Sequence, residues 1–213
     1  MCCMLKGIST DNQGLDNRGL TLIEVVVAVG IFAIVVTTVV ELLWYGWHSM
    51  RIVWDQLAVQ NEGRKVTQDL TNELRTANYS SIGSYPIASA GANDLTFYSD
   101  LDKDSYRERV RYFLVGTTLK KGVIIPTGTP LTYSTSSERV IDMVHDVANV
   151  ANPIFTYYDQ NYAGASSSPM SSPIDTTQVR VIGIYMRLEE NPLRSPVSFT
   201  IESKAVIRNL KNN

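Results

Sequence analysis

The chain has 213 residues, which is enough for one domain with a hydrophobic core but too few for two large domains. Its formal net charge of −2 leaves no basic surplus, so the bulk charge argues against a nucleic-acid partner. The two cysteines, Cys2 and Cys3, are adjacent, and adjacent cysteines rarely bridge, which excludes a disulfide framework and a cysteine zinc site.

The first 19 residues are polar and lack the apolar stretch of a conventional secretory signal peptide. An apolar run follows, and residues 20–40 carry one charged side chain, Glu24. As a helix this run would be about 31 Å long, close to the hydrocarbon thickness of a bilayer. Aromatic residues suited to a membrane interface come next: Trp44, Tyr45, Trp47 and Trp54. We therefore expect a transmembrane helix over residues 20–47, preceded by a polar N-terminal segment.

Basic residues lie mainly on the N-terminal side of the apolar run. Lys6 and Arg18 precede it, whereas Arg51 is the nearest base after it. The positive-inside tendency then places the N-terminus in the cytoplasm and exports the C-terminal part. We expect a single-pass protein of the inner (cytoplasmic) membrane.

Glu24 is the unusual residue of this run. A carboxylate at the bilayer centre costs roughly 2.5–3.5 kcal/mol, and less near the end of the span. Two interpretations account for it. Glu24 pairs with a cation of a neighbouring helix inside a packed bundle, or it lies at the membrane interface, protonated or reaching toward water.

Residues 18–24, RGLTLIE, followed by an unbroken apolar helix, resemble the prepilin signal of type IV pilins and type II secretion pseudopilins. The resemblance implies that residues 1–19 are a leader peptide, that a membrane peptidase cuts after Gly19, and that the new N-terminal residue, Leu20, is methylated. It also implies that Glu24 attracts the N-terminal amine of a neighbouring subunit. Two positions depart from the commonest pattern: Leu20 replaces phenylalanine, and no proline occurs near Glu41, where many major pilins have one.

This resemblance also implies the partners and the location of the chain. The expected partners are other pilins or pseudopilins, the prepilin peptidase/methyltransferase, an inner-membrane assembly platform, and membrane lipid before assembly. The protein would move from the inner membrane into an extracytoplasmic filament.

An amphipathic pattern continues the apolar run over residues 48–78. Its apolar or small residues recur every three or four positions: Val59, Gly63, Val66, Leu70, Leu74 and Ala77. No proline occurs between Leu20 and Tyr85, so one helix is expected to extend to about Asn78.

Residues 79–213 are expected to form a β-rich head. Alternating segments predict strands over residues 94–99, 109–115, 119–125 and 154–159, and a hairpin of 179–188 and 197–207 around a turn at 190–195. Residues 140–150 predict a short helix, and the Ser-rich residues 162–173 a mobile surface loop. The fold class is therefore α+β and pilin-like, with one long N-terminal helix packed on a mostly antiparallel sheet.

Three segments of the head, residues 95–102, 155–159 and 206–211, resemble those of W-type minor pilins and J-type minor pseudopilins. The resemblance implies a structural subunit rather than an enzyme. A ligand-binding pilin at a filament tip, for DNA uptake or adhesion, is the alternative. Such a pilin would bind its ligand through a cluster of basic residues: Arg107, Arg109, Arg111, Lys120 and Lys121. Because the cluster alternates along a strand, a solvated strand face is the simpler explanation for it.

Asp100, Asp102 and Asp104 alternate as in calcium-binding loops, and they are the candidate ligands for a cofactor. The EF-hand pattern fails at Ser105 and Arg111, where glycine and glutamate are required, so a solvated turn is the alternative. No other cofactor is expected. No phosphate-binding loop, dinucleotide fingerprint or nucleophile elbow occurs, which leaves a membrane-anchored enzyme without a catalytic signature.

Overall fold

A computed structural model describes residues 19–164, 166–189 and 198–210, without the side chains at 48–49, 51–53, 55–56 and 58. The predicted leader up to residue 18 and the predicted turn at 190–195 lie outside the described residues. The chain divides into two compact units, Met1–Met50 and Arg51–Asn213.

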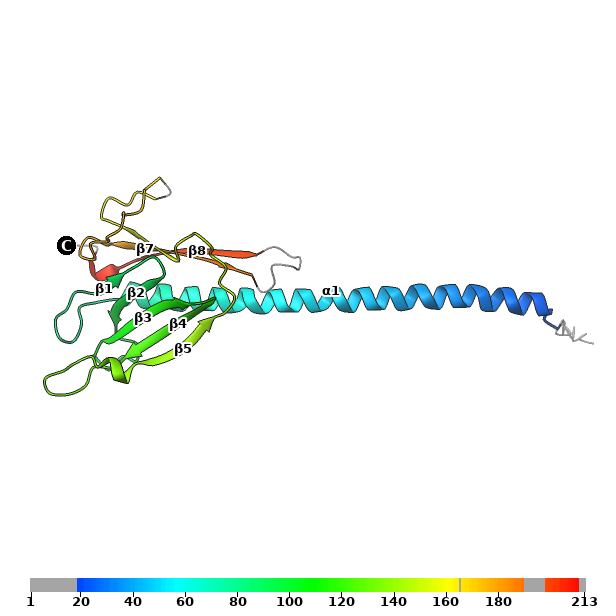
Figure 1. Ribbon diagram of the computed structural model, residues 1–213, viewed down its shortest axis with the longest axis horizontal. Helices are drawn as coiled ribbons and strands as arrows, with labels where there is room; N and C mark the ends of the chain where they lie inside the picture. Colours follow the sequence, from blue (N-terminus) through cyan, green and yellow to red (C-terminus); the bar gives the residue numbers. More distant parts are fainter. Residues whose placement is uncertain (1–18, 165, 190–197, 211–213) are drawn as a thin grey trace, which may run out of the picture. The chain divides into compact units, whose positions relative to one another are not determined.

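Helix α1 covers Leu22–Thr76, 55 residues, and confirms the predicted long helix (Figure 1). It ends two residues before the predicted Asn78. The Ala77 N–H still bonds to the Leu74 carbonyl at 3.2 Å, but the Asn78 N–H donates to the Tyr98 carbonyl at 3.0 Å. Pairing with a strand of the second unit therefore replaces the next helical hydrogen bond.

In the described part of the chain, eight strands form two antiparallel sheets, and Figure 1 shows their arrangement. The first sheet has the order β1 (Ile87–Ala90), β2 (Asp94–Ser99), β3 (Glu108–Val115), β4 (Thr118–Ile124) and β5 (Arg139–Val144). The second has the order β6 (Phe155–Tyr158), β7 (Val181–Leu188) and β8 (Phe199–Val206). Short 3₁₀ helices cover Thr135–Ser137 and Arg208–Leu210. The α+β class and the strands predicted near β2, β3, β4, β6, β7 and β8 are confirmed, but in two sheets instead of one.

The predicted short helix at residues 140–150 is wrong. Strand β5 occupies Arg139–Val144 and pairs with β4, with Ile141 opposite Lys121. Because β5 is an edge strand, Val140 and Ile141 are both exposed, and the apolar residues do not alternate as in a half-buried strand. Strand β1 was not predicted, since it has four residues with small side chains among them.

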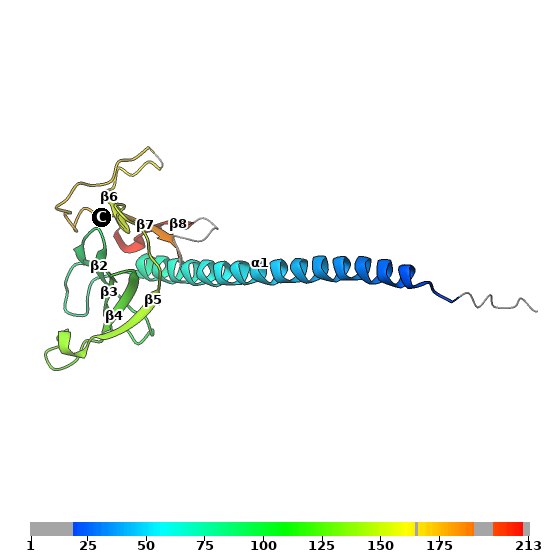
Figure 2. The same ribbon diagram turned by 45° about the vertical axis from the view of Figure 1, so that its right-hand side comes forward.

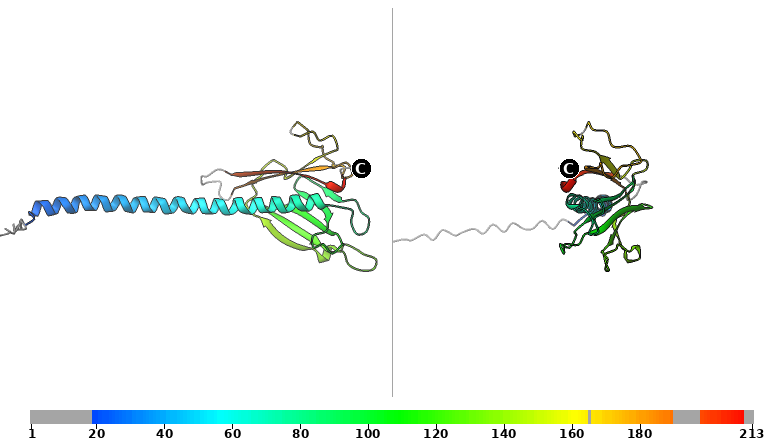
Figure 3. Two further views of the ribbon diagram at one scale, coloured as in Figure 1. Left: turned by 180° about the vertical axis from the view of Figure 1, so that it is seen from behind. Right: turned by 90° about the vertical axis from the view of Figure 1, so that its left-hand side faces the viewer.

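Within the second unit, the C-terminal part of α1 lies between the two sheets (Figures 2 and 3). Leu70 and Leu74 are fully buried there. A Cβ atom added at Gly63 would lie 2.5 Å from a Leu188 methyl and 2.6 Å from an Ile201 methyl. The glycine therefore permits the close approach of β7 and β8 to the helix. The predicted apolar stripe of α1 is thus part of the core.

Candidate functional site

The N-terminal end of α1 is formed by local hydrogen bonds of Thr21. Its carbonyl accepts the N–H groups of Glu24 at 3.1 Å and Val25 at 3.2 Å, and its hydroxyl Oγ1 lies 3.4 Å from the Glu24 N–H. Threonine at this position satisfies backbone donors that the helix leaves unpaired. The spacing of Thr21 and Glu24 is that of a capping box, a signal that the sequence analysis missed. Glu24 consequently lies in the first turn, where the helix dipole favours a negative charge.

Gly19 and Leu20 precede the helix. Residues 19–21 adopt no regular secondary structure, and the Leu20 side chain is exposed. No atom lies within 4 Å of a Cβ atom built at Gly19. The Gly19–Leu20 peptide bond is therefore in a non-helical segment, the kind of backbone that a peptidase can bind in extended form.

Glu24 lies on an apolar face of α1. It lines a shallow hollow together with Ile23, Val27, Ala28 and Ile31, which are spaced so that they share one side of the helix. The small Ala28 follows Glu24 by one turn and leaves room beside it. This face can receive another apolar helix in direct contact with the carboxylate.

The segment Leu22–Trp47 is long and apolar enough to cross a membrane. No side chain from Leu20 to Trp47 is buried, and large apolar groups such as Leu22 are up to 82% exposed. Exposed apolar surface of this extent requires lipid or other apolar helices around it. The segment thus fits a membrane anchor.

Residues 15–40 match a family model described as the prokaryotic N-terminal methylation motif. The chain carries the N-terminal signal of type IV pilins and pseudopilins. A search of the curated proteins finds no match. The matched residues include Gly19, Leu20 and Glu24. The pilin signal implies processing by prepilin peptidase and assembly with other pilins, and it is a signal of structural subunits rather than of enzymes.

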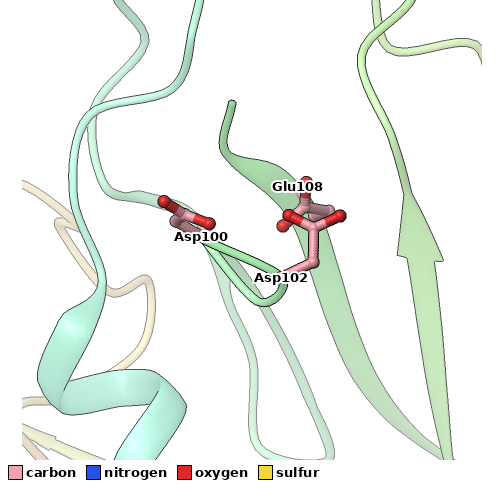
Figure 4. A group of neighbouring side chains, drawn as sticks. All are labelled: Asp100, Asp102 and Glu108. Carbon is pink, nitrogen blue, oxygen red and sulfur yellow. The ribbon is translucent and has the colours of Figure 1, made fainter. Parts of the chain in front are cut away.

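The β-rich unit of this pilin-like chain contains the predicted acidic cluster in part. One carboxylate oxygen from each of Asp100, Asp102 and Glu108 lies within 4.8 Å of the other two, and Figure 4 shows the three side chains. Asp104 is not in this group, and its Oδ1 accepts the Tyr106 N–H at 2.8 Å. Glu108 replaces it as the third acidic residue, although the sequence analysis did not select it. The available signal was an acidic residue directly before the predicted strand 109–115.

Glu108 differs from the two aspartates in its burial. Its side chain is 2% exposed, whereas Asp102 is exposed and Asp100 is half-buried. Burial raises the pKa of the Glu108 carboxyl. The backbone N–H groups of Leu101 and of Glu108 itself lower it, and the nearby Asp102 and Asp104 carboxylates raise it, so that the pKa lies above its ordinary value. The ionised form of Glu108 therefore needs a partner.

The predicted basic cluster does not form one surface. The Arg111 guanidinium donates two hydrogen bonds to the Glu138 carboxylate, at 3.0 and 2.9 Å. Lys120 pairs with Asp142 at 2.6 Å and is partly exposed. Lys121, by contrast, points toward α1 and is mostly buried. Three of the five basic residues are thus paired with acids of the same chain. Arg111 and Lys120 lie on one face of the sheet and Lys121 on the other, which does not favour a nucleic-acid interface.

Lys121 instead joins α1 to the first sheet. Its Nζ lies 2.5 Å from the Glu73 Oε1, and the Tyr112 hydroxyl donates to the Glu73 Oε2 at 2.9 Å. Burial raises the pKa of Tyr112, and the Glu73 carboxylate adds to the rise, so the phenol stays protonated as the donor. This trio is a structural contact.

Proposed function

We propose that the chain is a minor pilin or pseudopilin, a structural subunit of a type IV pilus-like or type II secretion filament. The matched signal at residues 15–40 supports the filament class. The similarity of three head segments to W-type minor pilins and J-type minor pseudopilins supports the minor class. Residues 1–19 are the leader, 20–47 the transmembrane and filament-core helix, 48–78 its amphipathic continuation, and 79–213 the head.

The chain is inserted into the inner membrane with its N-terminus in the cytoplasm. Prepilin peptidase cuts the bond after Gly19 and methylates the new amine of Leu20. An assembly platform then moves the subunit from lipid into an extracytoplasmic filament. Since lipid tails and apolar side chains are similarly apolar, this transfer brings little hydrophobic gain, and packing and polar contacts must direct it.

The observation that carries the proposal is the position of Glu24, in the first turn of α1, on an exposed apolar face and five residues after the cut. In a filament, this carboxylate pairs with the cationic N-terminal amine of a neighbouring subunit. In an apolar interior, such an attraction is much stronger than in water, and it fixes the axial register between helices.

Cleavage at Gly19 is the test of this function. The full chain is expressed together with a prepilin peptidase, and its size is compared with that of the Gly19→Leu variant. We expect the wild type to lose its leader and the variant to remain as full-length precursor in the membrane, because a bulky residue replaces the small one before the cut.

Gly14→Leu is the matched control, since it makes the same substitution elsewhere in the leader, and it should be processed like the wild type. Processing of Gly19→Leu at the wild-type rate, or a wild type that keeps its leader, would contradict the proposed function.

A further inference from the structure

The turn between β2 and β3 gathers three carboxylates at one point. Asp100 and Asp102 follow the end of β2, and Glu108 is the first residue of β3 (Figure 4). Each contributes an oxygen to a group whose members are all within 4.8 Å of one another. Carboxylates at these distances repel one another unless a positive charge or a proton lies between them.

Glu108 also has a buried carboxylate oxygen without a partner in the described part of the chain. Its Oε2 accepts the Leu101 N–H at 2.8 Å, but its Oε1 is buried and forms no hydrogen bond with any described residue. A buried carboxylate oxygen without a partner loses the stabilisation that water would give it. Since the side chain is 2% exposed, bulk water does not supply that partner. The orphaned oxygen belongs to the same carboxylate that completes the acidic group.

No basic side chain among the described residues forms an ion pair with this group. The described ion pairs are Arg111–Glu138, Lys120–Asp142, Lys121–Glu73 and Arg187–Glu189. All four lie outside the group of Asp100, Asp102 and Glu108. The described part of the chain therefore offers three acidic groups and no ion-paired cation to balance them.

The ligand type suits calcium. Calcium binds six to eight oxygen atoms in a flexible geometry and accepts several carboxylates. Magnesium usually keeps several waters and binds through one or two carboxylates, so a group of three carboxylates favours calcium. The backbone N–H groups of Lys103 and Asp104 bond to Oδ1 of Asp100 and Asp102, which leaves the second oxygen of each aspartate for an ion.

We propose that Asp100, Asp102 and Glu108 bind a calcium ion, which supplies the missing partner of Glu108 and fixes the β2–β3 turn. Water completes the coordination on the exposed side of Asp102. Asp104 has a different role: it accepts the Tyr106 N–H and shapes the turn without binding the ion. The binding set thus differs by one residue from the alternating aspartates of the sequence.

The test is thermal unfolding of the full chain in detergent, first freed of metal with EDTA and then supplied with calcium chloride. At a calcium concentration about tenfold above a Kd of roughly 10⁻⁴–10⁻³ M, we expect the Tm to rise by roughly 3–6 °C. Glu108→Gln keeps the shape of the buried side chain and removes its charge, so it should abolish the shift. Asp102→Asn, at an exposed position, should lower the calcium affinity about tenfold without threatening the fold.

Asp104→Asn is the matched control, because an asparagine oxygen can still accept the Tyr106 N–H. It should keep the wild-type calcium response. The proposal is overturned if calcium leaves the wild-type Tm unchanged, if magnesium gives an equal shift, or if Glu108→Gln responds like the wild type. If the wild-type Tm does not respond to calcium and Glu108→Gln is more stable than the wild type in EDTA, Glu108 is a buried protonated carboxyl and not a calcium ligand.

Discussion

At the residue scale, the proposed intermolecular role of Glu24 adds to a local one. Locally, it lies in the first turn of α1 after the Thr21 cap, where a negative charge stabilises the helix terminus. This local effect does not require an apolar face around the carboxylate. The hollow that Glu24 shares with Ile23, Val27 and Ala28 is suited to a second helix, and the intermolecular role accounts for it.

Glu24→Gln separates the two roles, because glutamine has the length of glutamate without its charge. We expect normal leader removal but roughly tenfold less subunit in sheared filaments, since the amine of the neighbour loses its counter-charge. Quantitative immunoblots of filament and membrane fractions measure the ratio. Glu41→Gln, the other acid of the candidate span, is the control and should assemble normally. Filament levels of Glu24→Gln equal to the wild type would rule out the register mechanism.

The N-terminal methylation motif was predictable from sequence because its signal is local, and residues 15–40 match it. Gly19, Leu20 and Glu24 lie within six consecutive residues, so their spacing along the chain carries the information. Glu108 was missed because its significance comes from burial and from an orphaned oxygen, and neither can be read from neighbouring residues. Asp104 matched the alternating pattern but accepts a hydrogen bond within its own turn.

At the element scale, Glu73 of α1, Tyr112 of β3 and Lys121 of β4 connect the helix to the first sheet. The side chains of Lys121 and Glu73 are 10% and 16% exposed, whereas those of Lys120 and Asp142 are 27% and 47% exposed. Neighbouring lysines of one strand thus form a largely buried and a largely exposed ion pair. Burial decides how much each contributes, because the loss of one partner leaves a buried charge unpaired.

Lys121→Met should lower the free energy of unfolding by about 2–4 kcal/mol, since it leaves the Glu73 carboxylate with the Tyr112 hydroxyl alone. Lys120→Met makes the same substitution one residue earlier and should have a much smaller effect, because water replaces its partner. Guanidinium unfolding of the full chain in detergent, monitored by far-UV circular dichroism, measures the free energy of unfolding of both variants. Equal losses for the two variants would contradict the structural role of the trio.

The secondary structure was predictable in proportion to the periodicity of each segment. α1 has no proline and carries an apolar pattern along its length, and β3 alternates between buried and partly exposed residues, so both lie where the sequence places them. Strand β5 was mistaken for a helix because its position at the edge of the sheet exposes both faces. The division into two sheets also escaped prediction, since strand pairing depends on contacts between distant residues such as Phe155 and Ile184.

At the scale of the whole molecule, the chain combines an apolar unit and a unit with a core. Among the side chains that the structure describes, the first buried hydrophobic one is Val66, and none lies between Leu20 and Trp47. The first unit therefore needs an apolar environment outside the chain, and the second forms its own core between two sheets. An exposed apolar unit joined to a unit with its own core suits a subunit that lies first in lipid and later in a bundle of similar helices.

The measurement that tests the central claim most directly is the N-terminal mass of the protein purified from its native membranes or filaments. Proteolytic peptides that contain the N-terminus are analysed by tandem mass spectrometry. The account predicts a chain that begins at Leu20 and is heavier by one CH₂ group at its amine. A native chain that begins at Met1, with an unmethylated Leu20 inside an intact Gly19–Leu20 bond, would contradict it.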